Sequence, residues 1–171
     1  LSWGGKDIMA YDAAYPNQVA GRGQVSPGMT PKVDMTFGGT LGVGADVLLT
    51  PKRQHPIPIE PTMFTTTPTW LDYIKNDPLK LHTASSSFLI QSTRMDRQIE
   101  RNLDGKRPPL LVFLAGQDRI IDNEATRELV TRNKQRSVTV IDYPDQTHSI
   151  QLDAPARLAG AITDWVEGLP E

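Results

Sequence analysis

The sequence of 171 residues contains no cysteine, which excludes disulfide bonds, a thiolate nucleophile and a zinc–thiolate site. It also lacks an excess of charge of either sign, because 18 basic residues stand against 20 acidic ones and the formal net charge is −2. A nearly balanced chain does not offer the broad basic surface that attracts nucleic acid or an anionic membrane. We therefore expect no nucleic-acid partner.

Long hydrophobic runs are missing as well. No apolar stretch approaches the roughly 20 residues of a spanning helix, so we expect no integral membrane segment. Histidines and carboxylates do not recur at metal-ligand spacing, and the glycine run at 38–44 lacks the Gly-Lys-Ser/Thr of a phosphate-binding loop. We expect neither a metal nor another cofactor, and we interpret the glycine run as a flexible loop.

The distribution of proline and glycine divides the chain into three stretches. Residues 1–29 open with a turn and a helix-compatible run, and a strand is expected within 19–26, although its polar centre is poor material for a buried strand. Residues 30–107 are rich in proline and loops before they turn helical. Asp77 and Pro78 resemble an N-cap followed by a first helical residue.

The last stretch, 108–171, alternates between strand and helix patterns. The uninterrupted apolar run at 110–115 is typical of a strand covered on both faces, and 138–143 is β-branched and strand-like. Asn123 and Asp153 are the predicted caps of the helices that follow. Strand, helix, strand, helix predicts right-handed βαβ units, and therefore an α/β fold with a parallel sheet and helices on both faces.

Two polar loops follow these strands. The first carries Asp118 and the second carries His148, and the carboxyl ends of neighbouring parallel strands meet at one edge of the sheet, where ligands bind. A carboxylate there can fix the tautomer of an imidazole and stabilise its protonated form. Such a pair needs a nucleophile, which without cysteine must be a serine, a threonine or a carboxylate.

Ser2 is the candidate nucleophile. A serine on a tight turn that opens a helix can hold its hydroxyl exposed, and Gly4 and Gly5 leave room for the turn and for helix packing. The helix N-terminus also brings free N–H groups to the place where an oxyanion would develop.

Each of these residues also has an ordinary interpretation. A serine near a chain end is usually a solvated hydroxyl or a helix cap, and Asp122 is a rival to Asp118 that we interpret as assisting the start of the next helix. His55 is expected in a loop and His82 in a helical segment, and both are interpreted as structural or solvated.

The order Ser…Asp…His resembles the α/β-hydrolase superfamily, and within it the lysophospholipase, monoacylglycerol lipase and serine aminopeptidase-like group. The motifs that carry the resemblance are Ser2-Trp3-Gly4-Gly5-Lys6, Ala115-Gly116-Gln117-Asp118 and Thr147-His148-Ser149. The resemblance covers nearly the whole chain but only the C-terminal half of the family's domain, starting at the nucleophile elbow. It implies hydrolase core at 1–29 and 108–171 and a helical cap at 30–107.

The resemblance also implies roles for individual residues. Ser2 matches the nucleophile, Asp118 the acid and His148 the base, and the backbone N–H of Trp3 matches one oxyanion donor. The family's N-terminal strands are absent, so the missing N-terminal half of the domain is an expected partner and the second oxyanion donor and substrate-binding residues are unassigned. A sheet of only the last strands leaves an edge bare, so we expect the chain alone to be unstable or to aggregate.

The implied function is that of a serine hydrolase that cleaves a small-molecule ester or lipid through an acyl-enzyme, with the cytoplasm as the expected location. An aminopeptidase of the proline iminopeptidase-like type is an alternative, with Glu60 and Asp72 as the only candidate cap carboxylates. A non-catalytic fragment or interaction domain is another. Several apolar residues either line an acyl pocket or simply pack between cap and core: Met29, Phe37, Met63, Phe64, Trp70 and Phe88.

Overall fold

The computed structural model describes residues 1–16, 18–32, 50–101 and 104–169. Within them, three parallel strands form one sheet in the order β1–β4–β5, so that the middle strand is the apolar one. Their bounds are β1 (Arg22–Val25), β4 (Leu110–Ala115) and β5 (Val138–Tyr143). The strands predicted at 110–115 and 138–143 are confirmed with the same bounds, whereas the strand expected within 19–26 spans four residues.

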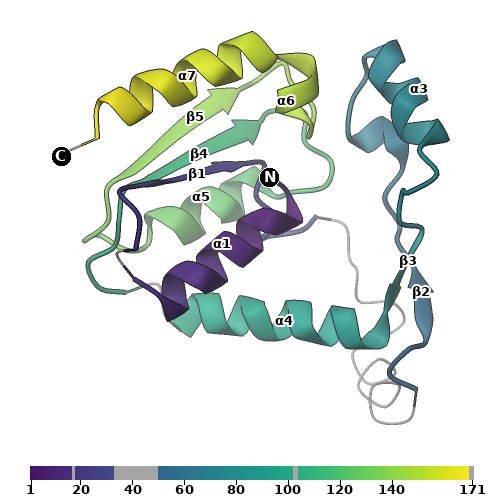
Figure 1. Ribbon diagram of the computed structural model, residues 1–171, viewed down its shortest axis with the longest axis horizontal. Helices are drawn as coiled ribbons and strands as arrows, with labels where there is room; N and C mark the ends of the chain where they lie inside the picture. Colours follow the sequence, from purple (N-terminus) through teal and green to yellow (C-terminus); the bar gives the residue numbers. More distant parts are fainter. Residues whose placement is uncertain (17, 33–49, 102–103, 170–171) are drawn as a thin grey trace.

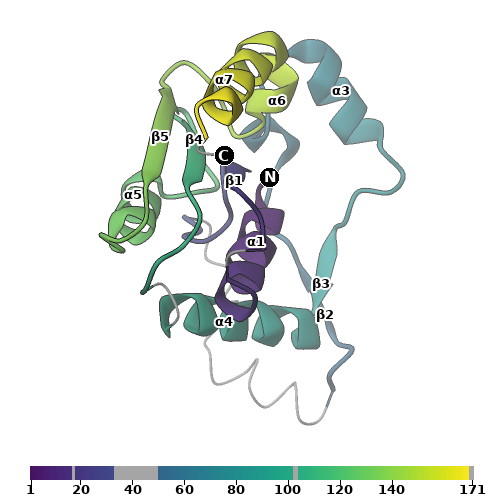
Figure 2. The ribbon, with the colours of Figure 1, turned by 60° about the vertical axis from the view of Figure 1, so that its left-hand side comes forward.

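Helices flank this sheet on both sides (Figures 1 and 2). One face is covered by α6 (Ile150–Asp153) and α7 (Pro155–Glu167), and on the other side lie α1 (Trp3–Ala14), α4 (Ser86–Arg101) and α5 (Asn123–Thr131). The predicted α/β fold with a parallel sheet is therefore confirmed. None of the helices in the described part of the chain combines the length and the apolar character needed to cross a membrane.

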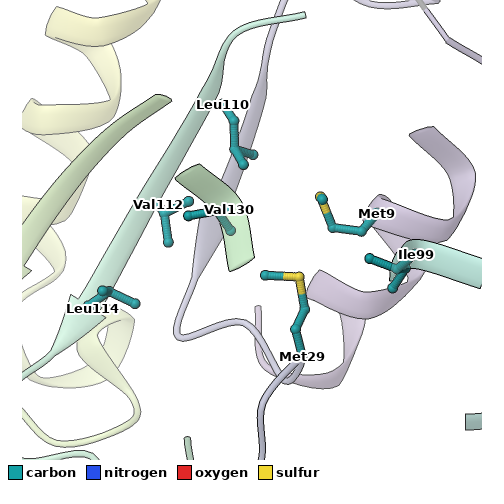
Figure 3. Packing of buried hydrophobic residues seen from close by; sticks show 7 residues of the cluster. All are labelled: Met9, Met29, Ile99, Leu110, Val112, Leu114 and Val130. Carbon is teal, nitrogen blue, oxygen red and sulfur yellow. The ribbon is translucent and has the colours of Figure 1, made fainter. Parts of the chain in front are cut away.

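The side chains of β4 build both halves of the core. Successive residues of a strand point to opposite faces. Leu110, Val112 and Leu114 accordingly pack with Met9, Ile99 and Val130 (Figure 3), and the alternate residues Leu111, Phe113 and Ala115 pack with Tyr143, Ile150 and Leu158. All six β4 side chains are fully buried. The continuous apolar run is thus explained by a central strand between two layers of helices.

The polar residues of β1 are held by α1. Arg22 forms an ion pair with Asp12 at 2.7 Å, and the Gln24 side-chain amide donates to the Gly5 carbonyl at 3.1 Å. Both strand residues are buried. These contacts explain how a strand with a polar centre can lie beside β4, because the Arg22 charge and the Gln24 side-chain NH₂ find partners on the helix that precedes it.

A hydrogen bond and an ion pair also join α1 to α4. The buried ammonium of Lys6 donates to the Ser92 hydroxyl at 2.9 Å and pairs with Asp96 at 2.7 Å. Burial raises the pKa of the Asp96 carboxyl above its ordinary value, although Lys6 acts in the opposite direction. The helix that follows Ser2 is therefore fixed to two separate parts of the fold.

Between β1 and β4, part of the chain projects away from the three-stranded sheet (Figure 1). It contains an antiparallel pair of short strands, a 3₁₀ turn and a helix: β2 (Gln54–Pro56), β3 (Thr83–Ser85), η1 (Pro61–Met63) and α3 (Pro68–Asn76). The helix start predicted at Asp77 is wrong. The Asp77 carboxylate instead accepts the Leu79 N–H at 2.8 Å, which makes a turn after α3, and α4 starts only at Ser86.

Two predicted helix caps also differ from the structure. Asp122, not Asn123, caps α5, because its carboxylate accepts the Ala125 N–H at 3.0 Å. Asp153 does not cap the final helix. It ends the short helix α6, and Ala154 stands before α7. At the start of α5 the capping pattern was ambiguous because Asp122 and Asn123, which can both cap a helix, are adjacent.

Candidate active site

Ser2 lies at the turn that leads into α1, in a backbone conformation that residues other than glycine rarely adopt. Its φ is +48°, and its hydroxyl makes no capping bond to the helix that it precedes. Three backbone bonds hold this turn: the Ser2 N–H donates to Val25, and the Ser2 carbonyl accepts from Gly5 and from Gly28 at 2.8 and 2.7 Å. The turn is thus pinned to the carboxyl end of β1, with its side chain free to point elsewhere.

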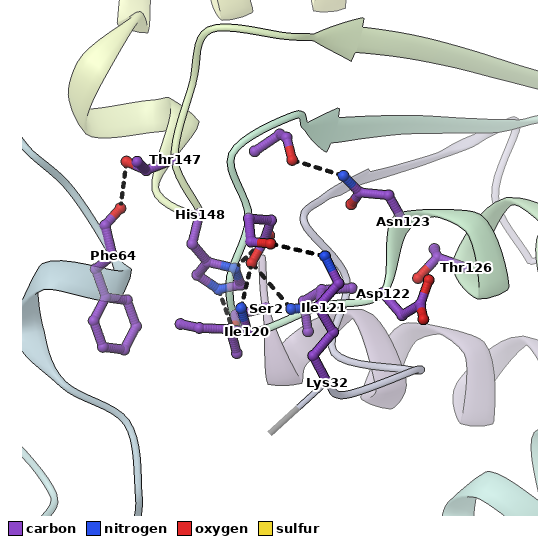
Figure 4. A network of polar contacts seen from close by, with 12 residues as sticks. Ser2, Lys32, Phe64, Ile120, Ile121, Asp122, Asn123, Thr126, Thr147 and His148 are labelled. Carbon is purple, nitrogen blue, oxygen red and sulfur yellow. Dashed lines mark hydrogen bonds and ion pairs between the residues drawn. The ribbon is translucent and has the colours of Figure 1, made fainter. Parts of the chain in front are cut away.

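The Ser2 hydroxyl lies beside His148, as the close view in Figure 4 shows. The distance from the Ser2 Oγ to the His148 Nε2 is 2.9 Å, and the other ring nitrogen, Nδ1, lies 2.8 Å from the Asp118 Oδ2. His148 is only 1% exposed and Asp118 only 3%. The three predicted side chains, which come from the turn before α1 and from the loops after β4 and β5, form one chain of hydrogen bonds.

Asp118 is fixed by its own loop. Its second oxygen, Oδ1, accepts the N–H groups of Ile120 and Ile121 at 2.8 and 3.0 Å (Figure 4 marks bonds to these two residues). This leaves Oδ2 to face the imidazole. With a carboxylate at Nδ1, the neutral ring carries its proton there and presents a lone pair at Nε2 to the serine. The arrangement is therefore able to take a proton from Ser2 and stabilise the resulting imidazolium.

The two loops that carry Asp118 and His148 are joined through their backbones. Gly116 donates to the Tyr143 carbonyl at 2.8 Å, and Gln117 donates to the Gln146 carbonyl at 2.9 Å. A Cβ on Gly116 would lie 2.5 Å from the Pro144 carbonyl oxygen. Glycine is needed at this position because the backbones approach so closely.

Trp3 directly follows the serine and is the first residue of α1. Its N–H therefore belongs to the group of N–H donors that have no acceptor within the helix. Its ring packs against Phe88 of α4, with 5.0 Å between the ring centroids. The amide predicted as an oxyanion donor thus lies at a helix N-terminus, where the helix dipole favours negative charge.

The other singled-out polar residues lie elsewhere. Asp122 caps α5, and His55 is a buried residue of β2 whose Nε2 lies 2.8 Å from the Ser86 hydroxyl, rather than in the loop expected for it. His82 is exposed and lies before β3, not in a helix. Among the residues that the structure describes, no group of three or more histidines and carboxylates is arranged to hold a metal ion.

Four of the apolar residues named as a possible acyl pocket have different neighbours in the structure. Met29 belongs to the core cluster on the α1 side of the sheet, and Trp70 contacts Tyr73 within its own helix. Phe88 packs on Trp3, and Phe64 meets the His148 ring edge-on at 5.6 Å. The predicted Phe37, like the glycine run at 38–44, lies outside the described residues.

Sequence reasoning missed the surroundings of His148. Thr147 and Ser149, on either side of the histidine, both bond to Phe64, and Asp153 binds the Thr147 hydroxyl. The Lys32 ammonium donates to the Asp118 carbonyl at 3.0 Å. No sequence pattern could have indicated these contacts, because most of them join residues that lie far apart in the chain and have common types.

A parallel sheet with helices on both faces and a serine, a histidine and an aspartate at the carboxyl ends of its strands defines the α/β-hydrolase class. The chain matches the family described as "Serine aminopeptidase, S33" over residues 1–155. It therefore belongs to that family.

Solved structures of lipases and esterases share this fold. A monoacylglycerol lipase of Paleococcus ferrophilus is 18% identical with a TM-score of 0.77, and the match covers 96% of this chain and 65% of that one. A soluble variant of monoglyceride lipase from Saccharomyces cerevisiae is 12% identical with a TM-score of 0.76, covering 97% and 59%. A carboxylesterase from Bacillus subtilis is 14% identical with a TM-score of 0.52, covering 97% and 57%.

The chain thus spans about two thirds or less of the length of these three structures. No curated protein matches it.

Proposed function

We propose that this chain carries the catalytic residues of a serine hydrolase that cleaves carboxylic esters. The observation that supports the proposal best is the continuous chain of hydrogen bonds from Ser2 through His148 to Asp118, at 2.9 and 2.8 Å. A serine in a strained turn at a helix N-terminus, with a buried imidazole on its hydroxyl, is the arrangement that activates an otherwise weak nucleophile.

In the first half of the proposed reaction, His148 takes the hydroxyl proton of Ser2 as the serine oxygen attacks the ester carbonyl. Asp118 remains ionised and stabilises the imidazolium. The Trp3 N–H donates to the developing oxyanion, and such a donor is worth about 3–4 kcal/mol of the barrier in comparable enzymes. The imidazolium then gives its proton to the leaving alcohol, and the acyl group stays on the serine.

In the second half, water replaces the alcohol. His148 takes a proton from the water as it attacks the acyl carbon, and the same oxyanion donor acts again. The serine oxygen leaves with the proton from His148, and the carboxylic acid product is released. Both halves use the same three side chains.

One feature favours an ester of lipid type as the substrate. The structures that share the fold include two lipases of monoacylglycerols. The proposed architecture is a hydrolase core formed by residues 1–29 and 108–171 with a cap at 30–107. Phe64, which belongs to this proposed cap, contacts His148, so the proposed cap borders the reacting groups.

Labelling with a fluorophosphonate tests the proposed nucleophile. The intact protein is expected to form one adduct at Ser2, located by peptide mass spectrometry, and Ser2→Ala is expected to abolish both the adduct and the hydrolysis of p-nitrophenyl esters. Ser87→Ala, at a partly exposed serine whose hydroxyl donates to the Pro51 carbonyl, serves as the matched control. Labelling that survives Ser2→Ala contradicts the proposal, and a folded protein without any adduct favours a non-catalytic role.

An aminopeptidase is the second candidate, because the matched family carries that description. Such an enzyme needs a carboxylate that binds the substrate amine. Glu60 and Asp72 are both exposed; Asp72 accepts from Asn76 within α3, and Glu60 accepts from Thr62. Turnover of p-nitrophenyl esters without turnover of aminoacyl anilides is expected, and the opposite preference would establish the peptidase.

A further inference from the structure

Asp153 is an acidic residue next to the candidate site that the proposed reaction does not use. Its Oδ1 accepts the hydroxyls of Thr65 and Thr67 at 2.7 and 2.8 Å, and its Oδ2 lies 3.1 Å from the Thr147 hydroxyl. Three threonine side chains from two distant parts of the sequence therefore converge on one carboxylate. A helix cap or a solvated surface charge would not gather three such donors.

The segment 64–67 is the part of the chain that this carboxylate holds. The Phe64 carbonyl accepts the Thr147 hydroxyl at 3.0 Å and the Ser149 N–H at 2.8 Å, so it is bonded to both neighbours of His148 (Figure 4 marks the Thr147 contact). The Phe64 ring lies edge-on to the imidazole with 5.6 Å between centroids. The segment thus touches the histidine and the residues on both of its sides.

Counting protons shows how the contacts depend on one another. The Thr147 hydroxyl has one proton, with two acceptors in reach, the Phe64 carbonyl and the Asp153 carboxylate. The Thr65 oxygen also accepts the Thr67 N–H at 3.0 Å, so it is a donor and an acceptor in the same network. Removal of the carboxylate would leave Thr65, which is fully buried, without its acceptor, and would remove the side-chain bonds that join Thr65 and Thr67 to the loop of His148.

We propose that Asp153 is a positioning residue: it binds the 64–67 segment to the loop of His148 and so holds the imidazole in line with Ser2. This inference rests on the proposed function. Asp153 does not touch the reacting atoms, and it acts through Phe64, Thr147 and Ser149. Small displacements of a general base are costly, since about 1 Å of misplacement can lower a rate 100-fold.

The test compares Asp153→Ala with Asp153→Asn in the intact protein. Asp153→Ala is expected to lower kcat for p-nitrophenyl esters and the rate of fluorophosphonate labelling at Ser2 by about 10- to 100-fold. Asp153→Asn is expected to keep both rates within about threefold, because its amide oxygen still accepts from Thr65 and Thr67, and its NH₂ can donate to Thr147, whose own proton then goes to Phe64. The labelling rate reports on His148 without a contribution from substrate affinity.

Asp164→Ala, an exposed change of the same type in α7, is the matched control and is expected to behave as the unaltered protein. If Asp153→Ala does not fold, as judged by circular dichroism, Thr147→Val decides instead, and it is expected to lower the labelling rate several-fold. Unchanged labelling in folded Asp153→Ala, an equal loss in Asp153→Asn, or unchanged labelling in Thr147→Val overturns the inference. These outcomes differ from failure of the proposed function, in which the unaltered protein itself is not labelled.

Discussion

At the scale of single residues, the protonation of His148 depends on which atom of the Asp118 side chain faces its ring. Asp118 uses Oδ1 for two backbone N–H groups and Oδ2 for the imidazole. Backbone N–H groups can only donate, so the side-chain atom that faces Ile120 and Ile121 must be an accepting oxygen. An asparagine at this place would therefore keep its oxygen on the backbone and turn its NH₂ toward His148.

This argument predicts the effect of Asp118→Asn. A donor facing Nδ1 forces the imidazole proton onto Nε2, and the ring then cannot accept the serine proton. We expect kcat to fall by about 10⁴-fold, as in comparable triads, with little change in thermal stability. The measurement is ester hydrolysis together with a thermal melt.

Asp122→Asn is the control for this experiment. It changes a neighbouring aspartate in the same way, and asparagine caps helices as well as aspartate does, so activity and stability are both expected to persist. A fully active Asp118→Asn would show that the acid of the site is another residue.

At the scale of elements, two adjacent glycines in α1 have different surroundings. A Cβ on Gly5 would lie 2.5 Å from the Pro27 Cβ and 2.9 Å from its Cα, whereas a Cβ on Gly4 would have nothing within 4 Å. The helix that carries Ser2 at its start therefore approaches the chain after β1 at Gly5 and not at Gly4. The sequence alone presents the two glycines as equivalent.

Gly5→Ala and Gly4→Ala are expected to change stability in opposite directions. The first must push α1 away from Pro27, and overpacking of this kind costs about 1–3 kcal/mol. The second replaces a helical glycine without a clash and is expected to stabilise the helix by up to about 1 kcal/mol. Urea unfolding measures both. Equal effects of the two substitutions would contradict the close packing at Gly5.

The helices and strands also show which sequence patterns were sufficient to predict an element and its bounds. The strands β4 and β5 were predicted with the bounds that they have, because a buried central strand and a β-branched strand are visible in local composition. The helix start at Asp77 was predicted wrongly, since Asp-Pro is equally suited to a turn. Local sequence does not distinguish these two uses.

At the scale of the whole molecule, one buried carboxylate joins three separate parts of the chain. Asp12 of α1 pairs with Arg22 of β1 at 2.7 Å and with Arg136, just before β5, at 3.0 Å. All three side chains are buried. Burial lowers the pKa of Arg136, and the nearby Arg22 and Arg107 act in the same direction while Asp12 opposes them.

We expect Asp12→Ala to destabilise the protein by about 3–5 kcal/mol, because two buried guanidinium groups lose the charge that they share. Asp7→Ala, an exposed change in the same helix, is the control and is expected to stay within about 0.5 kcal/mol. Chemical unfolding of both variants measures the difference. A loss for Asp12→Ala as small as that of the control would show that these charges do not hold the fold together.

The α/β class, the central strands and the three candidate side chains can be predicted from the amino-acid sequence, because each depends on residues that are close together in the chain or on a known order of motifs. The fold was needed to show which helix holds the polar side chains of β1, which residue caps α5, and that Asp153 binds three threonines beside His148. These features are contacts between residues distant in sequence. Their geometry depends on how the helices and loops pack around the sheet, and no local pattern records that packing.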